Sequence, residues 1–110
     1  MESEIRYSYK NIDQQQLESK LDELWRQIQE DSEIATEAEA SGISLSDVRG
    51  KLRREFITVT REGDGLDPVT TALIVAFAPV VAQVARDLWA KILLPRILRD
   101  KGRDALIPKK

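Results

Sequence analysis

The sequence contains no cysteine and no histidine. The lack of cysteine excludes disulfide bonds and thiol chemistry, and it removes the usual indication of the redox compartment. The lack of histidine removes the most common general base and the most common metal ligand, so Ser-His and Cys-His catalytic arrangements are excluded. Catalysis by Asp, Glu, Lys or Tyr alone stays open, but no spacing of these residues indicates an active site. We therefore predict a protein that is not an enzyme and that has no metal, no cofactor and no small-molecule substrate.

Glycine and proline are also scarce. The 110 residues include only five glycines and four prolines, whereas 33% of the residues are charged and 42% are hydrophobic. This composition favours helices, and the length suits one domain with a modest core. We predict a mainly α-helical α+β domain over residues 1–104, followed by a flexible basic tail over residues 105–110. The N-terminus is acidic and polar and has no secretory signal pattern, so we expect a cytoplasmic location.

Charge is divided unequally along the chain, although the formal net charge is only −2. Residues 1–47 hold twelve acidic and four basic residues, whereas residues 86–110 hold three acidic and eight basic ones. The two ends can attract each other within one chain or between neighbouring copies. Because the whole molecule carries no positive field, its charge does not favour nucleic acid as a partner.

Two short segments have the pattern of β-strands. In residues 4–10, Ile5, Tyr7 and Tyr9 alternate with polar side chains, which predicts a half-buried strand. Residues 56–60 are aromatic or β-branched throughout, which predicts a second strand. We expect the two segments to pair in a short two-stranded sheet. Helices must cover this sheet, because a lone hairpin is marginally stable in water.

The first helix is predicted to begin at Asn11 or Asp13, with Gln16 in position to complete a capping box with Asp13. Its outer face is acidic, and its apolar residues recur at spacings that place them on one face of a helix. We predict that this helix forms one half of a docking surface. Its apolar candidates are Leu17, Leu21, Leu24, Trp25 and Ile28.

The most apolar part of the chain lies in residues 68–94. The 18 residues from 68 to 85 carry no charge, and as a helix they would span about 27 Å. We predict a buried central helix that is kinked at Pro79, because proline interrupts the hydrogen bonds of a helix interior. The same length just suffices to cross a bilayer. A membrane-associated or membrane-inserting protein that uses residues 68–94 is therefore the alternative, and whether residues 68–85 meet protein core or lipid stays open.

A basic helix is predicted to follow from Pro95 to Lys101, with Gly102 at its end and Trp89 beside it. Three interpretations are open for its charges: a clamp on the acidic first helix, a surface for anionic lipid or nucleic acid, or a solvated end. The clamp is favoured because it explains the opposite charges of the two ends. The candidate residues are Trp89, Arg96, Arg99, Lys101 and Arg103.

Residues 34–52 resemble the spacing of a helix-turn-helix motif. The resemblance rests on a small residue, a turn glycine and apolar anchors, namely Ala38, Gly42, Ile43, Val48 and Leu52. In such a motif, Arg49 and Arg53 would lie toward DNA. However, Glu37 and Lys51 stand where apolar anchors are expected, and the acidic first helix would be repelled by phosphates. A DNA-binding regulator is therefore a further alternative.

These patterns lead to one principal functional hypothesis. We expect a protein-protein interaction module or small accessory subunit that self-associates or docks on a larger partner. The acidic first helix and the basic C-terminal helix would form the contact. A membrane-associated protein is the first alternative, and nucleic acid is the least favoured partner. The biological process and the identity of the partner are not indicated by the sequence.

Overall fold

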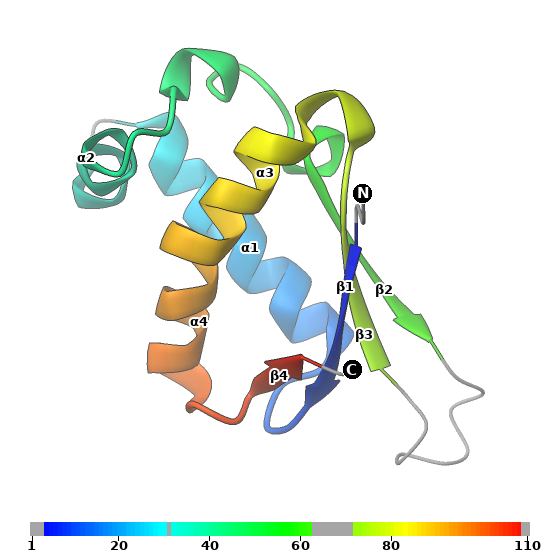
Figure 1. Ribbon diagram of the computed structural model, residues 1–110. Helices are drawn as coiled ribbons and strands as arrows, with labels where there is room; N and C mark the ends of the chain where they lie inside the picture. The colour runs from blue at the N-terminus through cyan, green and yellow to red at the C-terminus, as the bar shows by residue number, and fades with distance from the viewer. Residues whose placement is uncertain (1–3, 31, 63–71, 109–110) are drawn as a thin grey trace.

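The computed structural model describes residues 4–30, 32–62 and 72–108, and it consists of one sheet with helices packed on one of its faces (Figure 1). The strands are β1 (Glu4–Tyr9), β2 (Ile57–Glu62), β3 (Ala72–Phe77) and β4 (Leu106–Pro108). The helices are α1 (Gln14–Gln29), α2 (Glu33–Ala40), α3 (Ala82–Leu88) and α4 (Leu94–Lys101). Shorter turns are η1 (Leu45–Asp47), η2 (Arg53–Glu55) and η3 (Pro79–Val81), and a π-helical turn, η4 (Trp89–Leu93), joins α3 to α4.

The sheet is antiparallel and has the order β2-β3-β1-β4. Val75 of β3 pairs with Ile5 of β1 on one side and with Val59 of β2 on the other. These residues lie on the face that the helices cover. Thr58 and Thr60 alternate with them and are exposed on the opposite face. Successive residues of these strands thus alternate between the core face and the solvent face of the sheet.

The predictions for residues 4–10, for residues 56–60 and for the first helix are confirmed as elements. The capping box of α1 is present: Asp13 Oδ1 accepts a hydrogen bond from the Gln16 backbone N–H at 2.8 Å, and Gln16 Oε1 accepts one from the Asp13 N–H at 3.0 Å. The apolar face of this helix packs into the core. Local capping chemistry and helical periodicity were therefore sufficient to place α1.

The prediction of a two-stranded sheet and a kinked central helix is wrong. Residues 72–77 form β3, which lies between β1 and β2 and makes the sheet four-stranded together with β4. A strand with neighbours on both sides can be apolar at nearly every position, and over six residues this pattern does not differ from a buried helix. Residues 68–71 of the predicted helix lie outside the described residues.

The prolines act as starts of helical turns rather than as kinks. Pro79 occupies the first position of η3, where a missing N–H costs no hydrogen bond. Pro95 stands at the start of α4, directly after the π-helical turn in which the Leu94 N–H bonds to the Trp89 carbonyl. The wider turn lets the chain continue helically from α3 into α4, although a proline within a helical run usually interrupts it. Within the described residues, no helix combines the length and apolarity that a bilayer crossing would need.

The segment that resembled a helix-turn-helix motif has only its first helix, α2. After the turn at Gly42, the chain forms the short 3-10 turns η1 and η2 instead of a second helix. Ile43 and Val48 are buried as anchors, but Leu52 is 70% exposed. Without a recognition helix, the expected DNA-reading geometry is not formed.

The chain end was expected to be flexible over residues 105–110, but its described part joins the sheet. Ala105 and Leu106 are buried, and Ile107 of β4 pairs with Ser8 of β1. The Lys10 N–H also donates to the Ala105 carbonyl at 3.0 Å. Residues 109–110 lie outside the described residues.

Candidate interaction groove between helices α1 and α4

The apolar half of the predicted docking surface is the protein's own core. All five apolar candidates of α1 are buried, and so is Trp89. Trp89 donates its indole N–H to the Tyr7 hydroxyl at 2.8 Å, which ties η4 to β1. Burial raises the pKa of Tyr7, and the hydrogen bond from Trp89 opposes this rise. These side chains therefore hold the helices on the sheet and offer no surface to a partner. The residues are Leu17, Leu21, Leu24, Trp25, Ile28 and Trp89.

The two arginines predicted to face DNA lie in different environments. Arg49 is exposed, whereas the side chain of Arg53 is only 6% exposed. Arg53 Nε donates to Asp22 Oδ1 at 2.8 Å, and its Nη1 donates to the Ile57 carbonyl at 3.0 Å. Its Nη2 also lies 3.9 Å from Glu18 Oε1. Arg53 therefore links α1 to the edge strand β2 and has a structural role.

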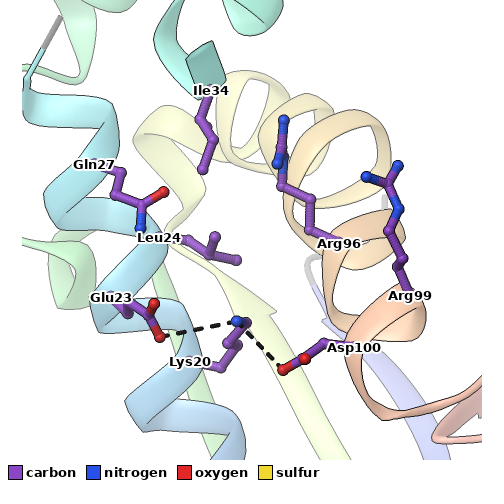
Figure 2. A pocket seen from close by; sticks show the side chains of 8 residues that line it. All are labelled: Lys20, Glu23, Leu24, Gln27, Ile34, Arg96, Arg99 and Asp100. Atoms are coloured by element: carbon purple, nitrogen blue, oxygen red, sulfur yellow. Dashed lines mark ion pairs between the residues drawn. The ribbon is translucent and has the colours of Figure 1, made fainter. Parts of the chain in front are cut away.

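Charge also links α1 to α4, but with the polarity opposite to the predicted clamp. Lys20 of α1 lies 3.3 Å from Asp100 of α4, so the base comes from the acidic helix and the acid from the basic one. Lys20 also lies 3.8 Å from Glu23 on its own helix. Figure 2 shows Lys20 between these two carboxylates. The majority charges of the two helices do not predict this pair, because Lys20 and Asp100 each oppose the majority charge of their own helix. The signal was available, since Asp100 is the only acidic residue of α4.

A second ion pair connects α4 to α2. Arg96 Nη2 donates to Glu37 Oε2, so here the base does come from the basic helix. The Arg96 side chain is 22% exposed, and its buried Nε–H has no hydrogen-bond partner in the described part of the chain. An unused buried donor is uncommon, because leaving it unpaired costs free energy. The sequence pattern marks Glu37 only as a departure from the helix-turn-helix spacing and does not predict this ion pair.

A cavity of about 260 Å³ lies between α1, α2 and α4 (Figure 2). Its two ends differ in charge. At one end, Lys20 is paired with Asp100 and Glu23, so charges of both signs meet there. The guanidinium groups of Arg96 and Arg99 extend from α4 in the opposite direction and make the other end positive (Figure 2). The lining residues are Lys20, Glu23, Leu24, Gln27, Ile34, Arg96, Arg99 and Asp100.

A neighbouring cavity of about 360 Å³ shares Lys20, Glu23 and Asp100 with the first one. Lys101 and the first turns of α1 complete its lining. We call the two cavities together the α1–α4 groove. Most of the groove lining is charged or polar, with groups of both signs, and a polypeptide segment can match such a surface with its own charged side chains.

Three cations at the end of α4 have no acidic partner among the described residues: Arg99, Lys101 and Arg103. We call them the α4 basic end. The acids of α1 that were expected to meet them are used elsewhere, since Asp22 and Glu18 face Arg53 and Glu23 faces Lys20. The predicted clamp therefore leaves these cations without an intrachain partner.

Another cavity, of about 590 Å³, lies between the segment after α2 and the start of α3. Val80, which is 97% exposed, forms its rim together with Val81 and Val84. Asp47 and Asp87 add two carboxylates, and Lys51 adds one cation. The unpaired buried donor lies at Arg96, so the α1–α4 groove carries the stronger indication of a ligand.

In the described part of the chain, no three His, Cys, Asp or Glu side chains are grouped closely enough to hold a metal ion. Comparison of the chain with protein-family models, with curated proteins and with solved structures finds no match.

Proposed function

We propose that this chain is a non-enzymatic protein-interaction module, which docks on an acidic segment of a partner protein through the α4 basic end and the adjoining α1–α4 groove. The observation that carries the proposal is the lack of described acidic partners for Arg99, Lys101 and Arg103. Unbalanced cations beside a groove attract a segment of opposite charge and accelerate its encounter with the surface.

The groove is more compatible with a protein than with nucleic acid or lipid. Single-stranded nucleic acids are usually bound by stacking bases on exposed aromatic rings. Here Trp25, Trp89 and Phe56 are buried. Insertion into a lipid surface would require a free apolar face on α4. Ile97 on this helix is buried in the core instead.

Binding of a defined acidic peptide would test the proposal directly. We expect a fluorescein-labelled oligoglutamate peptide to gain anisotropy on addition of the protein, whereas an oligolysine peptide gains none. The affinity should fall clearly between about 0.05 M and about 0.5 M salt, since exposed charges are screened over shorter distances at high salt. No binding of oligoglutamate at low salt would overturn the proposal.

Charge reversal on α4 tests the location of the site. Arg99→Glu and Lys101→Glu should each weaken oligoglutamate binding by about tenfold, because each replaces an attraction with a repulsion. Lys91→Glu is the matched control, since it makes the same charge change at an exposed position of the same helical run but outside the groove lining. Equal effects of all three variants would indicate a general charge effect and contradict the assignment to the groove.

Parallel measurements separate the other classes of partner. If the protein binds phosphatidylglycerol vesicles or oligothymidine more tightly than it binds the acidic peptide, the surface is a lipid-binding or nucleic-acid-binding surface instead. A second copy of the chain is also an acidic partner, because α2 exposes Glu33 and Glu39. Light scattering after size exclusion would detect an oligomer that dissociates at high salt and is lost in Arg99→Glu. The proposal keeps the cytoplasmic location expected from the sequence, and cell fractionation would test it.

A further inference from the structure

We propose that Arg96 and Arg99 form a subsite that binds a single Asp or Glu carboxylate of the partner, and that Glu37 occupies part of this subsite in the free protein. The inference rests on the docking function proposed above. It names the chemical group recognised in the groove and an internal group that competes with it.

One edge of the Arg96 guanidinium is only partly used. The Nε–H and Nη2 groups lie on one edge of a guanidinium, and this edge can bind both oxygens of a carboxylate. In Arg96, Nη2 donates to Glu37 Oε2, whereas the buried Nε–H has no partner in the described part of the chain. Glu37 therefore uses only half of the edge. A carboxylate that took both donors would satisfy the buried N–H and displace Glu37.

Arg99 supplies a second cation to the lining of the same cavity. Figure 2 shows its guanidinium extending from α4 on the same side as that of Arg96, away from the Lys20–Asp100 pair. Arg99 makes no ion pair with a described side chain. A carboxylate at Arg96 would therefore meet a second positive group, which the interaction with Glu37 does not use.

Two apolar side chains lie beside these cations in the cavity lining. Leu24 and Ile34 line the same cavity, and both are buried residues of the core cluster. They reduce the access of water beside Arg96, whose side chain is 22% exposed, and this strengthens a charge-assisted hydrogen bond there. The expected ligand is a side-chain carboxylate of the partner polypeptide.

Removal of the internal competitor provides the test. Glu37→Gln should strengthen oligoglutamate binding by about two- to fivefold, which corresponds to the loss of one half-exposed competing ion pair. Glu39→Gln is the matched control, because it removes the same charge from an exposed position of the same helix. Arg96→Lys should weaken binding by about tenfold, since an ammonium group has no planar edge for two oxygens.

A direct readout follows the Arg96 Nε–H resonance in a proton–nitrogen NMR spectrum during the peptide titration. The subsite predicts a shift of this resonance that saturates with the binding curve. If the peptide binds while the resonance stays fixed and Glu37→Gln behaves like Glu39→Gln, the subsite is overturned and the docking function is retained. If neither the native chain nor Glu37→Gln binds the peptide, both proposals fail. Melting curves of the two α2 variants check that both are folded.

Discussion

Replacement of Arg53 by alanine should destabilise the fold strongly, although the helix-turn-helix resemblance places this residue on the surface toward DNA. Arg53 is the only charged side chain in the buried core of the described chain. It donates to Asp22 on α1 and to the Ile57 carbonyl of β2, so it fastens the sheet edge to the helix layer. The Val59 carbonyl on the same strand accepts a hydrogen bond from Gln14 of α1 at 3.1 Å. The two side chains together occupy carbonyls along an edge that would otherwise be open to another strand.

The magnitude follows from the exposure of each partner. The bond from a charged donor to the Ile57 carbonyl contributes about 1.5–3 kcal/mol. Loss of the buried aliphatic stem adds about 1 kcal/mol. The Asp22 side chain is 63% exposed and regains water when its partner is removed, so that ion pair adds less than about 1 kcal/mol. We therefore expect Arg53→Ala to lower the free energy of unfolding by about 3 kcal/mol, and the melting temperature by about 10 °C.

Urea unfolding followed by tryptophan fluorescence measures this change, because both tryptophans are buried. Arg54→Ala is the control, since Arg54 is the exposed neighbour and its loss should change stability by less than about 0.5 kcal/mol. Asp22→Asn should cost less than about 1 kcal/mol, because the pair with an exposed carboxylate is weak. If Arg53→Ala were as stable as Arg54→Ala, the structural role of Arg53 would be refuted.

Two further predictions concern the core and a turn. Burial raises the pKa of Tyr7 above its ordinary value, so the folded state disfavours the phenolate. The free energy of unfolding should therefore be unaffected by this group below about pH 10 and should decline at higher pH, where the unfolded chain loses the proton more readily. Tyr7→Phe should lower the free energy of unfolding by about 1–2 kcal/mol at neutral pH, because the Trp89 N–H loses its acceptor. It should also flatten the decline in stability above about pH 10. A decline that is unchanged in urea titrations of the variant would show that Tyr7 is not its cause. Gly42→Ala should destabilise by about 1–2 kcal/mol in the same assay, since φ is +87° and the added methyl meets no atom; an unaffected variant would contradict strain as the reason.

The sequence was most informative where structure depends on neighbouring residues. The capping box at Asp13, the helical periodicity of α1 and the alternation in β1 are each determined within a few residues, and the structure confirms all three. The strand at residues 57–62 also follows from its β-branched composition. In these segments, local preference and tertiary packing favour the same element.

The assignment of residues 72–77 failed because the deciding interaction is not local. Ala72–Phe77 becomes a strand since β1 and β2 flank it on both sides, and the sequence at that position contains no alternation that would reveal this. The partners are supplied by residues about 15 and about 70 positions away, and pairing over such separations leaves no signature within the segment itself. The short β4 was missed for the same reason, because three residues become a strand only through contact with β1.

The candidate groove shows the same distinction in its charges. The majority charges of the two ends correctly indicated that α1 and α4 differ, but the contact between these helices uses Lys20 and Asp100, which oppose the majority charge of their helices. Had the acids of α1 neutralised Arg99, Lys101 and Arg103, the segregated charge would have been explained within one chain. Because those acids are instead engaged by Arg53 and Lys20, the attraction predicted between the two ends of the sequence remains available to another molecule. The predicted contact between the acidic first helix and the α4 basic end is not formed within one chain, and this is why we expect an acidic partner at the α4 basic end.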